Sequence, residues 1–306
     1  MTKVLIATDK PFSPVAVNGI RNIIEGAGFE LALLEKYTDV KDFYAAVTDV
    51  DALIVRSDKV TKEVIDAASK LKIVVRAGAG YDNLDLDACT AKRIVAMNTP
   101  GQNSNAVAEL ALGFMIYMAR TCFTPATGSE LSGKRLGIHA YGNVGRLVAQ
   151  KAKALGMDII AFDPFIPAEA ITKDGVKVAK NLEELYSNSD YLSLHIPATA
   201  ETKESINYNF LSLMPKGACL VNTARKEVIN EADMEKILAE RTDLKYITDI
   251  AAGNNDALMA FAPRYFATPK KMGAQTSEAN VNAGLAAANQ IVDFIKNGVT
   301  KFKVNK

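Results

Sequence analysis

Short apolar runs alternate with amphipathic stretches along the first hundred residues. The β-branched runs KVLIAT, FELALL, DALIVRS, LKIVVRAG and RIVAMN predict strands. Between them the pattern predicts helices that begin near Pro14, Thr38, Thr61 and Asp85. Strands that alternate with helices in this way are typical of a parallel sheet with helices on both faces.

A second series of the same kind begins near Lys134. Its predicted strands are RLGIHA, DIIAFD, YLSLHI, ACLVNT, YITDI and YFATP, with helices between them over 144–155 and 231–240. Residues 103–120, between the two series, are apolar on more than one face and predict a buried helix. The last segment, residues 278–298, predicts a long alanine-rich helix that Gly298 ends. The predicted fold is therefore α/β, with two doubly wound parallel-sheet domains.

The composition agrees with this picture and excludes several classes of protein. A chain of 306 residues is too long for one ordinary core, and 36 basic residues balance 35 acidic ones. This balance indicates neither a nucleic-acid nor a membrane partner. The N-terminal MTKVLIATDK is predicted to be a first strand rather than a signal peptide. Three scattered cysteines and two isolated histidines predict a cytoplasmic protein without a metal site.

The first candidate site lies where the second series opens. A predicted strand runs into the turn Ala140-x-Gly142-x-x-Gly145 and then into a helix, which resembles the dinucleotide-binding pattern GxGxxG with alanine in its first position. Gly142 lets a pyrophosphate approach the backbone, and the helix N-terminus favours phosphate. Asp163 ends the next predicted strand, where a carboxylate binds the adenosine ribose and repels a 2′-phosphate. The sequence therefore predicts NAD rather than NADP, the alternative being an ordinary glycine turn.

Together with its neighbours, this stretch resembles the D-isomer-specific 2-hydroxyacid dehydrogenases. The matching blocks follow in order along nearly the whole chain: VRAGAGYDNLDLDAC (75–89), NTPGQNSNAVAEL (98–110), SLHIPATAETK (193–203), LVNTARKEVI (220–229) and ATP with MGAQTSEA (267–279). Within the family the chain is most similar to the short 3-phosphoglycerate dehydrogenases. That subgroup lacks a C-terminal regulatory domain and carries a lysine in place of the catalytic histidine.

The resemblance implies a domain organisation. Residues 1–98 and 282–306 are expected to form a flavodoxin-like substrate-binding domain, and residues 99–281 a Rossmann NAD-binding domain. The family places its active site in the cleft between the two. A homodimer is expected by resemblance only, with the helix near residues 103–120 as a candidate interface.

The resemblance also implies which residues bind the substrate. It assigns Arg225 to the substrate's carboxylate and carbonyl, a task that suits the guanidinium fork. Structural alternatives are an arginine that only caps a surface loop and glycines that only allow a turn. The remaining residues implied in substrate binding are Gly78, Ala79 and Gly80 for the carboxylate, and Arg56, Ser57 and Asn103 for a 3-phosphate.

A third set of residues is implied in cofactor binding. His195 is expected to border the adenine pocket and Asp249 to position the nicotinamide amide, whereas His139 is predicted to be structural. The residues implied in NAD binding are Gly142, Asn143, Val144, Gly145, Asp163, His195, Pro197, Thr223, Asp249 and Gly273.

The proton carrier is where the chain departs from the family pattern. Most members have TPHxG, with a glutamate five residues after the strand-end aspartate that raises the pKa of the histidine. Here Asn254 stands five residues after Asp249, and lysines replace the histidine. The pKa of a lysine starts roughly four units higher than that of a histidine, so it must be lowered, and burial near Arg225 would do this.

Counting back from GAQT places Lys271, rather than Lys270, at the histidine position, although an insertion elsewhere would reverse this. Asp256 is a further candidate to replace the glutamate. We expect Lys271 to accept the hydroxyl proton while hydride leaves C2 for the nicotinamide C4.

The resemblance implies the NAD-dependent interconversion of 3-phosphoglycerate and 3-phosphohydroxypyruvate, the first step of serine biosynthesis. Two alternatives stay open. One is another reductase of the class, acting on hydroxypyruvate, glyoxylate or D-lactate. The other is a non-catalytic NAD-sensing scaffold, similar to the C-terminal binding protein corepressors.

Overall fold

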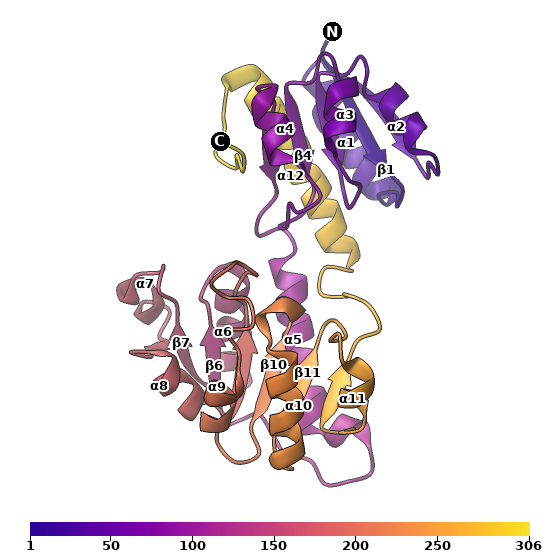
Figure 1. Cartoon of the computed structure of the whole chain (residues 1–306). Coiled ribbons are helices and arrows are strands. Elements are labelled where there is room, and N and C mark those ends of the chain that lie inside the picture. Colours follow the sequence, from indigo (N-terminus) through magenta and orange to yellow (C-terminus); the bar gives the residue numbers. More distant parts are fainter. The chain divides into compact units, whose positions relative to one another are not determined.

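A computed structural model describes all residues from 1 to 306 and divides the chain into two compact units (Figure 1). Unit 1 consists of Met1–Asn103 and Gln275–Lys306, and unit 2 of Ser104–Ala274. The predicted domain limits, after residues 98 and 281, lie a few residues away from these divisions. None of the helices combines the length and the apolar composition that a membrane span requires.

Unit 1 contains a five-stranded parallel sheet with the strand order β2-β1-β3-β4-β5. This is the flavodoxin-like order that the resemblance implies. The strands are β1 (Lys3–Thr8), β2 (Glu30–Glu35), β3 (Ala52–Val55), β4 (Ile73–Arg76) and β5 (Val95–Asn98). The helices are α1 (Pro14–Gly26), α2 (Val40–Ala46), α3 (Lys62–Ala67), α4 (Leu86–Ala91) and α12 (Ser277–Asn297).

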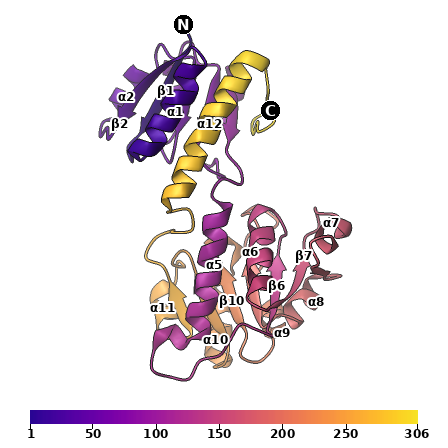
Figure 2. The ribbon, with the colours of Figure 1, turned by 180° about the vertical axis from the view of Figure 1, so that it is seen from behind.

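The side chains of β1 show how this sheet is covered on both faces. Val4 and Ile6 pack with buried residues of α1 and α12, which lie side by side in Figure 2. Leu5 and Ala7 point the other way and pack with α2, α3 and α4. Since successive side chains of a strand point to opposite faces, an all-apolar strand of this kind requires two helical layers.

Unit 2 contains a seven-stranded parallel sheet with the order β12-β11-β10-β9-β6-β7-β8. Read from β8, this is the Rossmann order with one additional strand. The strands are β6 (Arg135–His139), β7 (Asp158–Phe162), β8 (Lys177–Val178), β9 (Tyr191–Leu194), β10 (Cys219–Asn222), β11 (Lys245–Thr248) and β12 (Tyr265–Ala267). The sequence pattern missed β8, because two residues are too few to show an alternation.

Helices cover both faces of this sheet as well. One face carries α5 (Ser104–Ala119) and α6 (Asn143–Ala154), and the other carries α8 (Leu182–Ser187), α9 (Tyr208–Leu213) and α10 (Glu231–Glu240). The remaining helices are α7 (Ala168–Thr172), α11 (Asn255–Met259) and the short turns η1 (Thr121–Phe123) and η2 (Lys226–Val228). The predicted fold class, two doubly wound parallel α/β domains, is confirmed.

Candidate active site

The turn between β6 and α6 has the features of a phosphate-binding cradle. Ala140 adopts a φ of +79°, a conformation that favours glycine, so the alanine takes the turn at a conformational cost. A Cβ on Gly145 would overlap the carbonyl oxygen of Ala140, and this explains why a glycine stands there. A Cβ on Gly142 would meet nothing within 4 Å. Gly142 and Asn143 are exposed at the first turn of α6, with Val144 half-buried behind them, so a phosphate can reach the helix N-terminus.

Asp163 lies just beyond the end of β7, beside this turn. Its carboxylate accepts hydrogen bonds from the backbone N–H of Tyr141 (2.7 Å) and of Phe165 (2.8 Å). Two ionised oxygens offer about four acceptor positions, so these bonds orient the group without saturating it. Asp163 remains half-buried and can accept further hydrogen bonds from ribose hydroxyls.

The two histidines are neutral near physiological pH. Burial lowers the pKa of His139 to about 4, and its Nδ1 lies 3.3 Å from the hydroxyl of Tyr186. Burial, together with the neighbouring His139, lowers the pKa of His195 to about 3. An imidazole that resists protonation in this way is poorly suited to carry a proton at neutral pH.

Two buried polar atoms without partners lie at the ends of neighbouring strands. They are Nε2 of His195, which follows β9, and Oγ1 of Thr223, which follows β10. Because β6, β9 and β10 are adjacent and parallel, both residues lie at the same edge of the sheet as the cradle, and the exposed Pro197 follows there. Buried polar atoms normally have partners, so this edge fits a polar ligand such as a dinucleotide. Gly142–Gly145 would hold its pyrophosphate and Asp163 its adenosine ribose.

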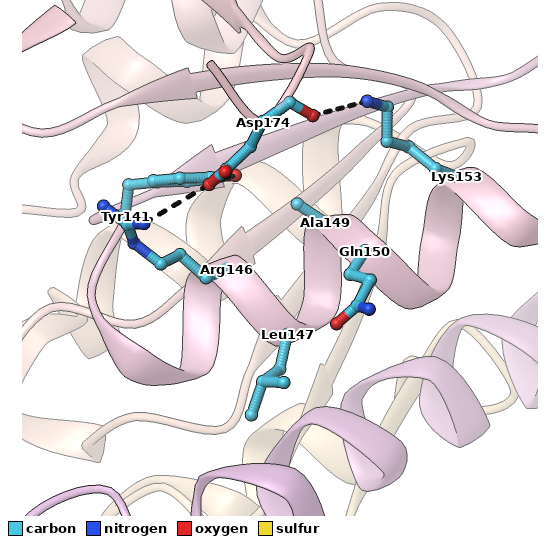
Figure 3. Close-up of a pocket in the computed structure, with 7 residues that line it drawn as sticks. All are labelled: Tyr141, Arg146, Leu147, Ala149, Gln150, Lys153 and Asp174. Carbon is cyan, nitrogen blue, oxygen red and sulfur yellow. Dashed lines mark hydrogen bonds and ion pairs between the residues drawn. The ribbon is translucent and has the colours of Figure 1, made fainter. Parts of the chain in front are cut away.

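A cavity of about 480 Å³ on α6 lies outside this arrangement (Figure 3). Its charged groups pair with one another: Asp174 accepts hydrogen bonds from the Tyr141 hydroxyl (3.1 Å) and from Arg146 (3.4 Å). Lys153 donates to the carbonyl oxygen of Asp174 at 2.6 Å. No predicted site residue lines this cavity.

The candidate reaction centre is built on the turn after β10. The buried Asn222 accepts a hydrogen bond from the N–H of Ala224 (3.0 Å) and donates one to the carbonyl oxygen of Arg225 (2.9 Å). These bonds fix the turn that carries Arg225. The guanidinium makes one hydrogen bond, from Nη1 to the carbonyl oxygen of Ala224 at 2.9 Å.

Lys271 reaches the same turn from the segment after β12. Its Nζ donates to the carbonyl oxygen of Ala224 at 3.2 Å, so the two cations of Lys271 and Arg225 share one acceptor. Lys271 is exposed rather than buried. Lys270 is also exposed and makes no hydrogen bond or ion pair. Of the two lysines, only Lys271 is therefore held beside Arg225.

The buried Asp249 lies next to this pair and holds the backbone of the lysine segment. Its carboxylate accepts hydrogen bonds from the N–H of Met272 (2.7 Å) and of Gly273 (2.7 Å), and from the hydroxyl of Thr268 (3.3 Å). Burial raises the pKa of Asp249, and the backbone N–H groups and Lys271 oppose the rise. A Cβ on Gly273 would lie 2.8 Å from this carboxylate, so only glycine allows the close approach.

Asn254 stands at the position of the missing glutamate, and Asp256 is the candidate to replace it. Asn254 donates a hydrogen bond to the carboxylate of Glu235 (3.0 Å) and leaves its buried Oδ1 without a partner. Asp256 is exposed at the start of α11 and makes no side-chain hydrogen bond. The structure links neither residue to Lys271.

In unit 1, the arginine that is predicted to bind a phosphate already hydrogen-bonds other residues of the same unit. Arg56 donates to the carbonyl oxygens of Lys10 (2.7 Å) and Pro11 (2.9 Å), and to Oδ1 of Asn280 in α12 (2.7 Å). Its guanidinium also lies over the ring of Phe12, and burial lowers its pKa. Arg56 thus ties together the β1–α1 loop, the end of β3 and α12.

The other predicted substrate residues gather at the carboxyl edge of the unit 1 sheet. Gly78 has a φ of +154°, and Asn98 holds its loop by donating to the carbonyl oxygen of Ala79 at 2.6 Å. Gly80 and Asn103 are half-buried and Ser57 is exposed; the side chains of Ser57 and Asn103 make no hydrogen bond. Because β3, β4 and β5 are adjacent and parallel, these residues share one edge.

Sequence reasoning missed Asn222 and Ala224. Ala224 acts through its backbone and leaves no signal in the sequence. Asn222 did leave one, because a polar residue that ends a buried strand usually hydrogen-bonds the following turn.

Comparison with known proteins extends these observations. Residues 117–269 match the model of the D-isomer specific 2-hydroxyacid dehydrogenase, NAD binding domain. Among solved structures, the NAD⁺-bound 3-phosphoglycerate dehydrogenase of Entamoeba histolytica is similar, with 48% identity and a TM-score of 0.89. That match covers 100% of this chain and 99% of the other.

Two curated relatives differ in how much of their own length is matched. The D-3-phosphoglycerate dehydrogenase of Methanocaldococcus jannaschii is 36% identical over 85% of this chain, which spans only 52% of that relative. The hydroxypyruvate reductase of Thermotoga maritima is 34% identical over 86% of this chain and 90% of its own length. The chain thus spans about half the length of the curated D-3-phosphoglycerate dehydrogenases that it matches.

Proposed function

The chain belongs to the D-isomer-specific 2-hydroxyacid dehydrogenase family, and from this premise we propose that it interconverts 3-phosphoglycerate and 3-phosphohydroxypyruvate with NAD. The observation that carries the proposal is the pair of hydrogen bonds by which Arg225 and Lys271 reach one carbonyl oxygen, that of Ala224. Two cations held so close together favour an anionic ligand. Such a centre can bind a 2-keto acid and exchange a proton with it.

In the proposed mechanism each residue has one task. Arg225 has four guanidinium N–H donors beyond its bond to Ala224, and it binds the carboxylate through its planar fork. Bound NAD supplies the hydride acceptor. Lys271 takes the proton from the substrate's 2-hydroxyl in the oxidation and returns it to the same oxygen in the reduction.

Two kinds of observation support a phosphorylated substrate. The Entamoeba structure and the Methanocaldococcus relative both carry the name 3-phosphoglycerate dehydrogenase. In unit 1, the side chains of Ser57 and Asn103 have unused hydrogen-bonding groups, and Ser57 directly follows the positively charged Arg56. We propose that these residues bind the phosphate, and that the reaction is the first step of serine biosynthesis.

A hydroxypyruvate reductase is the second candidate, and a specific observation favours it. The guanidinium of Arg56 is already bonded to Lys10, Pro11 and Asn280, which weakens the expected phosphate contact. The Thermotoga relative, matched over 90% of its length, carries that name. An assay of NADH oxidation with phosphohydroxypyruvate, hydroxypyruvate and glyoxylate separates the two by the ratio of kcat/KM. NADH binding without oxidation by any 2-keto acid would instead indicate an NAD-sensing scaffold.

The role of Lys271 is tested by a pair of neighbouring variants. Lys271→Ala should lower kcat about a thousandfold, because a positioned acid or base contributes roughly 10²–10⁴-fold. The dissociation constant of NADH should stay within a factor of about 3. Lys270→Ala is the matched control and should keep nearly full activity. Equal losses in both variants would refute the assignment.

We also propose that the protein is a homodimer that uses α5. Its exposed residues form one stripe, and a Cβ on Gly113 within it would meet nothing within 4 Å, so a second chain could approach closely. The residues of this stripe are Asn105, Glu109, Gly113 and Ile116, and the exposed Arg120 directly follows the helix. Sedimentation of the wild type and of Gly113→Leu tests this, and only the wild type should sediment as a dimer.

A further inference from the structure

Arg225 and Lys271 come from segments more than forty residues apart, and their like charges repel at the carbonyl oxygen of Ala224. The hydrogen bond from Lys271 to that oxygen joins the two segments, but it acts through an exposed side chain. Other groups hold the backbones of the two segments as well.

Two buried side chains at the ends of adjacent strands are placed to do this. Asn222 ends β10 and Asp249 follows β11, and the N–H of Asp249 donates to the carbonyl oxygen of Asn222 at 2.9 Å. The exposed fractions of the two residues are 1% and 2%. Each therefore acts on the neighbouring turn from a position that water hardly reaches.

The two side chains each hold a different segment. Asn222 bonds the N–H of Ala224 and the carbonyl oxygen of Arg225, and Asp249 bonds the N–H groups of Met272 and Gly273. Both bonds of Asp249 measure 2.7 Å, in the range of charge-assisted hydrogen bonds. Lys271 directly precedes the two amides that Asp249 binds.

We infer that Asn222 and Asp249 are a pair of positioning residues, Asn222 for Arg225 and Asp249 for Lys271, which bring the two cations to one oxygen. This inference rests on the proposed function for its catalytic consequence. It gives Asp249 a role in the protein without cofactor, separate from the expected contact with the nicotinamide amide.

Isosteric substitutions separate the two roles. Asp249→Asn turns an amide NH₂ toward one of the two backbone N–H groups, and Asn222→Asp removes the donor to the carbonyl oxygen of Arg225. Asp233→Asn is the matched control, because Asp233 also accepts a backbone hydrogen bond, from the N–H of Tyr208 at 2.9 Å, away from both turns.

The first readout is amide hydrogen exchange in the cofactor-free protein, which does not depend on activity. Asp249→Asn should speed exchange at Met272 and Gly273 at least about tenfold, since hydrogen bonds to charged groups are worth that much or more. Asp233→Asn should leave these two amides unchanged. Unchanged exchange at Met272 and Gly273 in Asp249→Asn, and also in Asp249→Ala, would overturn the inference.

The second readout is steady-state kinetics, which shows whether each substitution changes kcat or the KM for the keto acid. Asp249→Asn should lower kcat about tenfold or more with little change in the KM for the keto acid, whereas Asn222→Asp should mainly raise that KM. If Asp249 acted only on the nicotinamide, its substitution would weaken NADH binding and leave exchange unchanged. If exchange rises as expected while Lys271→Ala keeps full activity, the positioning role stands and the proposed role of Lys271 fails.

Discussion

Arg56 and Arg225 occupy equivalent places in the two units, yet the fold treats them differently. Each follows a buried parallel strand at the carboxyl edge of its sheet. Arg56 donates to three acceptors and lies over an aromatic ring, whereas Arg225 donates to one carbonyl oxygen. One strand-end arginine is thus a structural tie, and the other keeps most of its N–H donors available for a ligand. The acceptors around each arginine make this difference.

The largest effect is expected on kcat/KM when Arg225 is replaced, and this substitution tests whether the two arginines differ in role. Arg225→Ala should lower kcat/KM for the keto acid about a thousandfold, because removing one partner of a close charge pair costs about 4 kcal/mol. The free energy of unfolding should change by less than about 1 kcal/mol, since the side chain makes one hydrogen bond within the fold. Steady-state kinetics and urea unfolding measure the two quantities.

Arg56→Ala is the control. It should change the free energy of unfolding strongly and kcat/KM only slightly. Losing bonds to Lys10, Pro11 and Asn280 should lower the free energy of unfolding by about 3 kcal/mol. Its kcat/KM for hydroxypyruvate, which has no phosphate, should fall less than about tenfold. A stable Arg56→Ala variant or an unstable Arg225→Ala variant would remove the distinction between the two arginines.

The two histidines extend the comparison to another kind of titratable side chain, because burial lowers the pKa of both. The pKa of His139 is about 4 in the folded chain, against 6.5 for the ordinary group. As pH falls below 6.5, the unfolded chain takes up a proton that the folded chain refuses until about pH 4, so stability falls across that window. The loss should approach 3 kcal/mol, at 1.36 kcal/mol for each pKa unit.

Urea unfolding at several pH values measures this loss, with His139→Gln for comparison. The variant should lose less stability than the wild type between pH 6.5 and 5, since glutamine does not titrate. His195, with a pKa of about 3, should continue to contribute in both proteins. Identical pH slopes would mean that His139 titrates normally in the folded chain.

The smallest effect is expected at the cradle, where the backbone rather than a charge is constrained. Ala140→Gly should raise the free energy of unfolding by about 0.5–1 kcal/mol, because glycine adopts the φ of +79° without strain. NADH binding should stay equal or improve. A less stable variant would show that the Ala140 methyl group makes contacts worth more than the strain. Thermal unfolding provides the measurement.

Much of the fold and part of the site could be predicted from the sequence. Runs such as KVLIAT and RLGIHA specify buried strands because parallel strands covered on both faces need apolar residues throughout. The turn from Ala140 to Gly145 could be recognised because the tight turn and the close helix packing leave room only for glycine at Gly145. Sequence patterns carry such local requirements directly.

Which charged groups remain available for a ligand was decided by the tertiary structure alone. The acceptor that engages Arg56 from α12, Asn280, lies 224 positions along the chain, and Lys271 meets the Ala224 carbonyl oxygen across 47 positions. Nothing in the local pattern around either residue records these partners. The sequence by itself determined where strands end and which polar residues follow them. Only folding determined which of those residues have hydrogen-bond partners within the protein, because a hydrogen bond depends on atoms brought together in space.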